Sequence, residues 1–420
     1  MDADLLIENA DCIYTCRGPA PRRGRRQADA GLLPHGSIAA ARGVIVAVGA
    51  AADLRRQISL TPDATIIDAT GGTVVPGFVD PHTHLVFAGD RRDELQRRLA
   101  GATYADIAAD GGGILKTVLA TRAATQAELI DDALPRLRAM LSCGTTTAEV
   151  KSGYGLDTAT ELRMLRSIKR LSALQPIELS ATFMGAHEIP IDYRTRRNDY
   201  IHLVTHEMIP AVAAESLAEW CDVFCEHGVF TADETRTVLE AGLRRGLKPR
   251  VHADELGLSG GSAVAAGIGA RSADHLIFVD ESHAEGLAAA DVIATLLPAA
   301  AFYLKLGRFA PARMLIEKGV AVALASDLNP GGGFSPSMPF AMTLACFGMG
   351  MTLEEALVAA TLNAAAALDR ADRVGSLEVR KQMDAVIVHG TLADFIRVGA
   401  PVIRTVIKRG KLEWTDAAIC

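Results

Sequence analysis

The chain lacks the excess of basic residues that a nucleic-acid-binding protein needs. Its 420 residues include 43 Lys and Arg against 50 Asp and Glu, which gives a formal net charge of -7 at pH 7. Binding to nucleic acid requires a basic face that neutralises phosphates. The acidic balance therefore argues against that class of partner and favours a small-molecule substrate.

The chain also lacks the cysteine pattern of a disulfide-stabilised protein. Its seven cysteines are an odd number without a framework spacing, which suits a reducing compartment. Two C-x3-C pairs, at 12–16 and 221–225, lack a partner pair at zinc-finger spacing, so we interpret them as core residues. The first residues, MDADLLIENADC, are acidic where a signal peptide is basic. We therefore expect a cytoplasmic protein.

No uninterrupted apolar run of membrane-spanning length is present. The best candidate, residues 286–304, is broken by Asp291 and Pro298, so we expect a buried strand with helical flanks there. The basic run RRGRR at 22–26 follows Pro21 and is expected to be a solvated loop.

What the chain does contain is a repeating pattern of short apolar runs, each followed by a turn and a stretch of helical periodicity. Runs that are apolar on both faces are typical of parallel strands covered by helices. Eight such units over about 300 residues predict an α/β fold of the (β/α)8 TIM-barrel type. The predicted strands are 76–82, 145–152, 177–187, 220–226, 249–255, 271–278, 291–297 and 320–327.

Both ends of the chain differ from this pattern, because they consist of short β-type runs divided by Gly and Asp turns. Neither end has enough strands for a sheet domain of its own. We therefore predict one small β-sandwich built from residues 1–75 with 376–420, beside a catalytic barrel formed by residues 76–375.

Polar residues of the predicted barrel gather at the carboxyl ends of its strands, where barrel enzymes carry their active sites. A lone histidine on an apolar strand is more often a hydrogen-bonded core residue than a ligand. His82 and His84, however, point to the same side of one strand, and such a pair suits a single metal ion. The whole set comprises His82, His84, His187, His252, Glu255, His275 and Asp327.

A second histidine pair competes with this interpretation. His202 and His206 are spaced i, i+4, as on one face of a helix, but they lack the H-E-x-x-H order of a helical zinc protease. We expect them on an outer helix of the barrel.

Several motifs resemble those of a known family. PGFVDPHTH at 76–84 resembles the first-strand signature of the amidohydrolase superfamily, and HADE at 252–255 and SD at 326–327 match its single-metal members. The resemblance narrows to the imidazolonepropionase family through DPHTHLVFAGDR, KSGYGL, GAHE, ADHL and SDLNPG, in collinear order. It implies a metal-dependent hydrolase of histidine degradation that opens the ring amide of 4-imidazolone-5-propanoate to N-formimino-L-glutamate.

Two other hypotheses stay open at this point. Another mononuclear amidohydrolase, such as a heterocycle deaminase, would share the same metal centre, although its substrate would leave a carboxylate-binding arginine unpaired. A catalytically inactive barrel kept for a structural role is the third hypothesis, and the retained ligand set argues against it.

The family resemblance also implies roles for particular residues. One divalent metal ion, Zn or Fe, would be held by His82, His84, His252 and Asp327; the fourth predicted strand has no lysine for a second ion. Asp327 would take the proton of the attacking water, Glu255 would carry a proton to the leaving nitrogen, and His275 would orient the water or stabilise the oxyanion. A homodimer is common among similar proteins and is expected here.

The substrate contacts implied by the resemblance begin with Arg91, whose guanidinium can hold the propionate with two hydrogen bonds. Arg92 is its nearest rival by position. Gly332 stands where the family usually has Ser or Thr, so one hydroxyl contact is absent unless Ser335 replaces it. The full predicted substrate set is Arg91, Tyr154, His187, Glu255, Asn329, Gly331 and Gly332.

Overall fold

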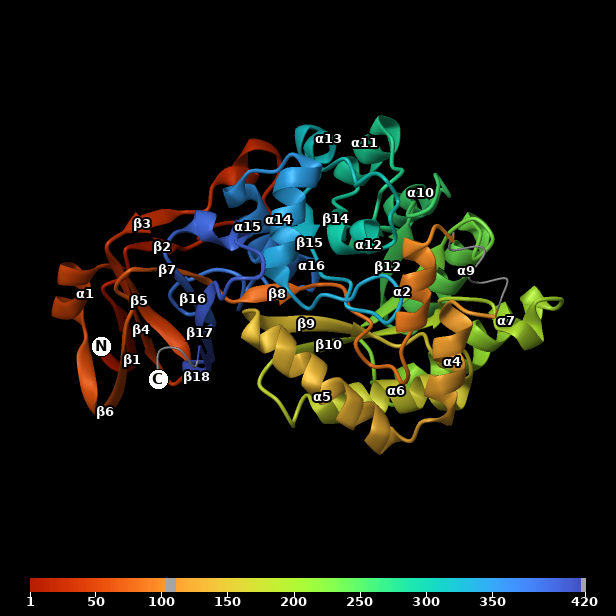
Figure 1. The fold of residues 1–420 in the computed structure, drawn as a ribbon, viewed down its shortest axis with the longest axis horizontal. Coiled ribbons are helices and arrows are strands. Elements are labelled where there is room, and N and C mark those ends of the chain that lie inside the picture. The colour runs from red at the N-terminus through yellow and green to blue at the C-terminus, as the bar shows by residue number, and fades with distance from the viewer. Residues whose placement is uncertain (103–110, 417–420) are drawn as a thin grey trace.

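The computed structural model describes residues 1–102 and 111–416, and its centre is a barrel of eight parallel strands (Figure 1). Each strand pairs with its neighbours in chain order, and each overlaps the range that the sequence predicted, with β12 beginning one residue earlier, so the predicted fold class is confirmed. The strands are β8 Phe78–Asp80, β9 Thr145–Lys151, β10 Glu178–Ala186, β11 Trp220–Cys225, β12 Lys248–Ala253, β13 Ser272–His275, β14 Ile293–Leu296 and β15 Val322–Leu324.

The barrel closes between its first and last strands through bonds just beyond the ends of β8 and β15. The backbone N–H of Asp327 donates to the carbonyl of His82 at 3.1 Å, and the N–H of His84 donates to the carbonyl of Leu328 at 2.9 Å. The buried Asp80 carboxylate accepts from the backbone N–H of Ser326 at 3.0 Å. This closure brings the H-x-H pair beside Asp327, although the two segments are far apart in the sequence.

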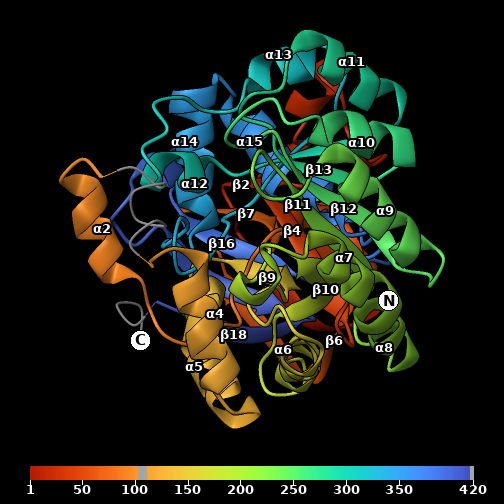
Figure 2. The same cartoon turned by 90° about the vertical axis from the view of Figure 1, so that its right-hand side faces the viewer.

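Helices surround the strands (Figure 2). Several begin with a capping box, in which a Thr and the Glu three residues later exchange bonds with the backbone, as Thr125 and Glu128 do at the start of α5. The stretches of helical periodicity at 125–144, 158–174 and 231–246 contain α5, α6 and α9. The helices are α1 Ala51–Gln57, α2 Arg92–Leu99, α4 Ile114–Ala123, α5 Gln126–Ser142, α6 Thr158–Leu171, α7 Arg197–Leu203, α8 Ile209–Ala214, α9 Ala232–Leu243, α10 Gly261–Ile268, α11 Glu281–Ala289, α12 Pro298–Tyr303, α13 Ala312–Glu317, α14 Met338–Met349, α15 Leu353–Ala360 and α16 Leu362–Ala367.

The two ends of the chain share one six-stranded sheet, in the order β18-β17-β16-β7-β2-β3, and a four-stranded sheet, β5-β4-β1-β6, accompanies it. Ile7, Ile38, Val74 and Ile387 belong to one buried apolar cluster that joins the sheets. The predicted division into 1–75 with 376–420 and 76–375 stays a prediction. The strands are β1 Asp2–Glu8, β2 Cys12–Tyr14, β3 Leu32–Pro34, β4 Gly36–Ala41, β5 Val44–Ala50, β6 Ser59–Asp68, β7 Gly72–Pro76, β16 Ala385–His389, β17 Ile403–Lys408 and β18 Lys411–Thr415.

The prediction of a solvated loop for the basic run is wrong for Arg22. Its side chain is buried, and its backbone N–H donates to the side-chain oxygen of Asn363 at 2.7 Å, whereas Arg25 and Arg26 are exposed. Gln27, just after the run, is buried and exchanges two hydrogen bonds of 3.1 Å with the backbone of Val322 in β15. The run thus begins a segment that fastens the N-terminal part of the chain to the barrel.

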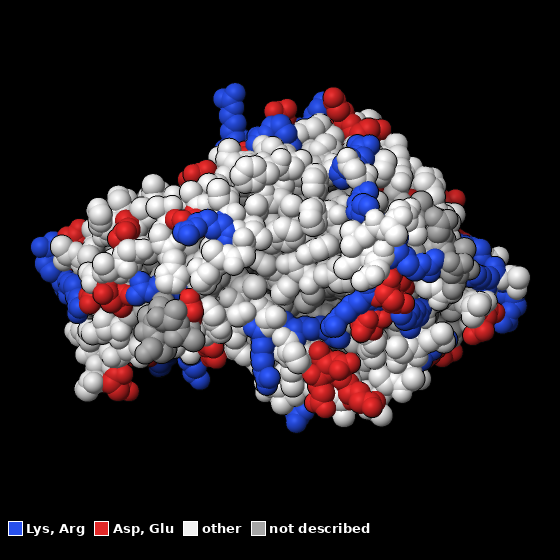
Figure 3. Space-filling model, in the orientation of Figure 1, with Lys and Arg blue, Asp and Glu red and all other residues white. Residues whose placement is uncertain are grey.

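The long apolar stretch 286–304 forms part of α11, then β14, then α12, as predicted. Among the described residues, no helix has the length and apolar character needed to cross a membrane. The six described cysteines are unpaired, and Cys16, Cys221 and Cys225 are buried; Cys420 lies outside the described residues. On the face drawn in Figure 3, basic and acidic side chains lie interspersed.

Candidate metal centre and substrate pocket

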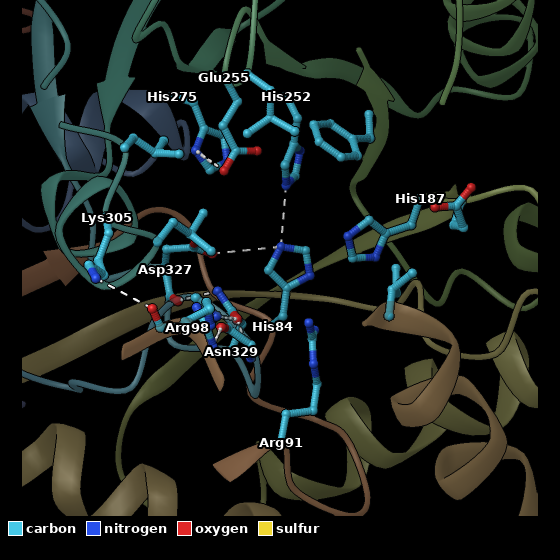
Figure 4. A pocket seen from close by; sticks show the side chains of 18 of the residues that line it. His84, Arg91, Arg98, His187, His252, Glu255, His275, Lys305, Asp327 and Asn329 are labelled. Atoms are coloured by element: carbon cyan, nitrogen blue, oxygen red, sulfur yellow. Dashed lines mark hydrogen bonds and ion pairs between the residues drawn. The ribbon is translucent and has the colours of Figure 1, made fainter. Parts of the chain in front are cut away.

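A pocket of about 400 Å³ opens at the carboxyl ends of the barrel strands (Figure 4). The chain segments that follow β8, β9, β10, β12, β13 and β15 all contribute side chains to it. Of the predicted site residues, His82 alone does not line the pocket, because it is fully buried behind His84 and His252. The predicted residues that line it are His84, Arg91, Tyr154, His187, His252, Glu255, His275, Asp327, Asn329, Gly331 and Gly332.

Three imidazoles meet at the base of this pocket. His82, His84 and His252 each offer a nitrogen, and these atoms all lie within 4.8 Å of one another. The Nε2 atoms of His84 and His252 are 3.2 Å apart. Oδ1 of Asp327 lies 3.6 Å from Nε2 of His82 and 3.9 Å from Nε2 of His84. The chain therefore brings three nitrogens and one carboxylate oxygen to a single point.

Buried carboxylates hold two of the imidazoles in one tautomer. Nδ1 of His82 donates to Asp274 at 2.7 Å, and Nδ1 of His252 donates to Asp222 at 3.1 Å. With Nδ1 protonated, Nε2 of each ring carries the lone pair and points at the shared centre. The carboxylate in each of these two pairs thereby orients the nitrogen that can bind a metal ion.

The donor set fits a divalent d-block ion. Nε2 of His82 is buried and has no hydrogen-bond partner among the described residues. Burial lowers the pKa of both His82 and His84 well below the usual value, so both rings are neutral at pH 7 and can act as ligands. Three imidazoles and one carboxylate are typical of a single zinc or iron(II) site.

A network of buried charges lies beneath this centre. The ammonium group of Lys151 in β9 is fully buried, 2.7 Å from Glu149 and 2.8 Å from Asp222. Arg250 in β12 is also fully buried and contacts Asp274 at 3.2 Å. The sequence interpretation missed these residues. Their signal was a charged residue inside an otherwise apolar strand, which is rare without a partner.

Glu255 and His275 lie next to each other on one side of the pocket, with Oε1 of Glu255 3.5 Å from Nδ1 of His275 (Figure 4). Burial, followed by the nearby carboxylates of Asp327 and Glu226, raises the pKa of Glu255 well above its usual value. Burial also raises the pKa of Asp327 to about 8. The raised pKa favours the protonated form of Glu255, which is the form in which a carboxyl group can donate a proton.

Arg91 and Arg92 have different surroundings. Arg91 is 6% exposed and lines the pocket, whereas Arg92 is exposed at the start of α2. Figure 4 shows Arg91 pointing into the pocket from the edge opposite Glu255. Arg91, and not its neighbour, is thus placed to meet an anionic substrate group.

Tyr154 and His187 form another part of the wall. Their ring centroids lie 5.3 Å apart, and the ring of His187 stacks on that of His84 at 4.9 Å. Nδ1 of His187 donates to the carbonyl of Gly153 at 3.0 Å. Burial lowers the pKa of His187 to about 3, so the ring is neutral and its Nε2 is an acceptor.

The loop after β15 is held by Asn329. Its Oδ1 accepts from the backbone N–H groups of Gly331 at 2.8 Å and Gly332 at 2.6 Å, and its Nδ2 donates to the carbonyl of Asp327 at 2.8 Å. A Cβ atom at Gly331 would lie 2.1 Å from Nη1 of Arg91, so an added side chain there would displace the guanidinium. Ser335 does not line the pocket.

Two further basic residues in the pocket were not foreseen. Nη2 of Arg98 in α2 donates to the carbonyl of Gly331 at 2.5 Å, and Nζ of Lys305 donates to the carbonyl of Arg98 at 3.4 Å. No motif marks them, because they reach the pocket from an outer helix and a distant loop. The rings of His202 and His206 stack on each other at 4.1 Å along an outer helix and do not line the pocket.

Comparison with known proteins agrees with this geometry. The sequence model of the amidohydrolase family matches residues 73–412. A protein named imidazolonepropionase from Symbiobacterium thermophilum is 50% identical over 412 residues, which cover 97% of each chain. A protein of the same name from Alkaliphilus metalliredigens is 45% identical over 415 residues and 98% of each chain.

Solved structures with the same fold are much less similar in sequence. A zinc-bound adenosine deaminase from Xanthomonas campestris has a TM-score of 0.69 at 20% identity, covering 99% of this chain and 93% of its own. A triazine hydrolase variant has a TM-score of 0.74 at 14% identity, covering 97% and 94%. Fold, site geometry and sequence similarity together show that the chain belongs to the amidohydrolase superfamily and, within it, to the imidazolonepropionase family.

Proposed function

We propose that this chain hydrolyses the ring amide C–N bond of 4-imidazolone-5-propanoate to N-formimino-L-glutamate, a step of histidine degradation. The proposal rests on one observation. A cluster of three imidazoles and one carboxylate lies in the same pocket as a buried arginine. The full-length similarity to proteins named imidazolonepropionase supports the same activity.

His82, His84, His252 and Asp327 would hold one divalent ion, for which we propose zinc or iron. When bound, such an ion polarises the amide carbonyl and lowers the pKa of a coordinated water from about 15.7 to about 7. The carboxylates of Asp222 and Asp274 keep two of the imidazoles in the required tautomer, so the protein's own contribution is orientation before any substrate arrives.

Proton transfer is the work of the residues on the two sides of the reacting carbon. Asp327 would accept the proton of the attacking water as a carboxylate, because the positive charge of a bound ion would lower the pKa that burial raises to about 8. Glu255, whose pKa burial raises, would donate a proton to the ring nitrogen as the C–N bond breaks. His275 lies 3.5 Å from Glu255 and would stabilise the oxygen on which negative charge develops.

The substrate would lie with its ring between the catalytic carboxylates and the wall formed by Tyr154 and His187. Its propionate would meet Arg91, because a buried guanidinium pairs strongly with a carboxylate. The loop held by Asn329 would close one side, and Gly332 offers no hydroxyl there. A deaminase substrate without a carboxylate would leave the charge of Arg91 uncompensated, which disfavours the alternative function.

A direct assay tests the proposal. Purified protein should contain about one divalent ion per chain, and it should convert imidazolone propionate to N-formimino-L-glutamate. A chelator should abolish turnover, and added zinc or iron(II) should restore it. Release of ammonia from a heterocycle, with no turnover of imidazolone propionate, would favour the deaminase instead.

Arg91→Ala tests the assignment of the propionate site. Loss of a buried charge partner should raise KM by roughly a hundredfold, while kcat changes much less. Hydrolysis of an uncharged imidazolone at the same rate as the propionate would contradict the substrate assignment. We further propose that the protein is cytoplasmic and forms a homodimer. Size-exclusion chromatography coupled to light scattering would test the oligomeric state.

A further inference from the structure

A buried carboxylate that the proposed reaction does not use lies directly behind Arg91. Glu94, in the first turn of α2, is 2% exposed. Its Oε2 accepts from both Nε and Nη2 of Arg91, each at 2.8 Å. Its Oε1 accepts from the backbone N–H of Gly113 at 2.8 Å. Both oxygens of Glu94 are therefore engaged, and the residue joins Arg91 to the chain just before α4.

The helix itself does not require this buried charge. An acidic residue in the first turn of a helix is favourable without being buried. Asp93, the preceding residue, already provides one, since it is exposed and pairs with Lys116 at 2.7 Å. Burying a second carboxylate costs solvation free energy, which is recovered only through well-formed bonds such as those to Arg91.

The contacts of the guanidinium show what the pair achieves. Nε and Nη2 are held by Glu94, while Nη1 lies on the opposite side, against Gly331 in the pocket wall. Because Glu94 holds one edge of the planar guanidinium, the end that faces the pocket keeps a single orientation. Arginine binds a carboxylate through two N–H groups, so its orientation governs the strength of that bond.

We infer that Glu94 is a positioning residue for substrate recognition: it orients the Arg91 guanidinium to receive the propionate carboxylate. This inference rests on the proposed function, since it assumes an anionic substrate group at Arg91. Glu94 helps binding only through Arg91, and without Arg91 it would be a buried anion that repels the substrate.

The orientation is tested by affinity ratios. Imidazole propionate carries the ring and the propionate but no ring carbonyl, so it serves as a probe that is bound and not hydrolysed. Isothermal titration measures the dissociation constants of each variant for this probe and for its uncharged propionamide. The ratio of the two constants does not depend on the fraction of protein that is folded. In Glu94→Gln the preference for the charged probe should fall about tenfold. Asp93→Asn, an equal charge change one residue away, should leave it unchanged.

The double variant tests the predicted change of sign. In the Arg91→Ala background, adding Glu94→Gln should tighten binding of imidazole propionate by about threefold or more, because the repelling anion is removed. In the native background the same substitution should weaken it. Weakening in both backgrounds, or an unchanged ratio in Glu94→Gln, would show a purely structural role and overturn the inference.

Failure of the inference and failure of the proposed function are distinguishable. If the native protein hydrolyses imidazolone propionate and Glu94→Gln keeps the native probe ratio, only the inference is wrong. If the native protein shows neither turnover nor a preference for the charged probe, the proposed function itself is wrong. Should Glu94→Gln not fold, Glu94→Asp keeps the charge but shortens the reach, and its ratio should fall as well.

Discussion

At the scale of single residues, burial decides which carboxylates can carry protons. Glu255 sits in a pocket where low polarity and neighbouring carboxylates raise its pKa well above the usual value, which favours the protonated form that the proposed reaction needs. An ordinary surface glutamate would be ionised there and unable to protonate a leaving nitrogen. The environment, and not the residue type alone, provides the acid.

Glu255→Gln should therefore slow turnover with little effect on substrate affinity. Glutamine keeps the shape but cannot donate a proton, and loss of a general acid typically costs about 10²- to 10⁴-fold in rate. Steady-state kinetics with imidazolone propionate checks the expectation, with bound metal measured as a control. A variant with native kcat would remove Glu255 from the mechanism.

Gly331→Ala should disturb substrate binding through Arg91. The added Cβ would come 2.1 Å from Nη1 of Arg91, so the guanidinium must move. We expect KM to rise by about tenfold or more. Gly49→Ala is the matched control, because no atom lies within 4 Å of its added Cβ. Equal kinetics for the two variants would show that the arginine tolerates displacement.

At the scale of secondary-structure elements, alternate barrel strands share a set of buried charges. β9 contributes Glu149 and Lys151, and β11 contributes Asp222, which orients the proposed metal ligand His252. One buried ammonium thus compensates two carboxylates on two strands. A buried charge network of this kind stabilises only while every member has its partner.

Lys151→Met should be strongly destabilising, since it leaves Glu149 and Asp222 buried without their shared cation. Removal of one partner of a buried pair costs about 3–5 kcal/mol. Lys116→Met removes a surface partner of Asp93 and should cost under about 1 kcal/mol. Urea unfolding of the metal-free proteins measures both. Similar losses for the two variants would contradict the account of the buried network.

At the scale of the whole molecule, an ion cluster links the base of the barrel to the terminal sheets. Glu178 at the start of β10 pairs with Arg370 and Arg373 near the end of the barrel, and with Arg409 between β17 and β18. Burial would raise the pKa of Glu178, but the surrounding basic groups, Lys408 and Arg373 foremost, outweigh it and lower the pKa.

Glu178 should accordingly contribute to acid resistance. Because its folded pKa lies below the unfolded value, its contribution is present above the usual glutamate pKa and is lost as pH falls through the folded pKa. Glu178→Gln should thus have a lower Tm than the native protein at pH 7, and the gap should narrow below about pH 4. A gap that stays constant with pH would show that the carboxylate charge is not the cause.

Much of this arrangement was predictable from local pattern. The apolar runs predicted all eight barrel strands, and the position of His82, His84, His252 and Asp327 at strand ends predicted one cluster. The burial of Arg22 and the roles of Glu94, Lys151 and Arg98 were not predictable. Arg22, Lys151 and Arg98 each bond to a partner in a distant segment, and Glu94, although it pairs with nearby Arg91, is also held by the backbone of Gly113. Spacing within one segment carries no information about such partners.

The sequence by itself determined the barrel, the family and the residue types of the metal site, because strand periodicity and ligand spacing are local properties of a chain. Only the tertiary structure decided which charges are buried and what each one faces. The charged run DRRDE at 90–94 contains the exposed residues Arg92 and Asp93 and the buried residues Arg91 and Glu94. The physical reason is that the solvation and pairing of a charged side chain depend on the whole fold. Two neighbouring residues of the same type, such as Arg91 and Arg92, can therefore have different roles.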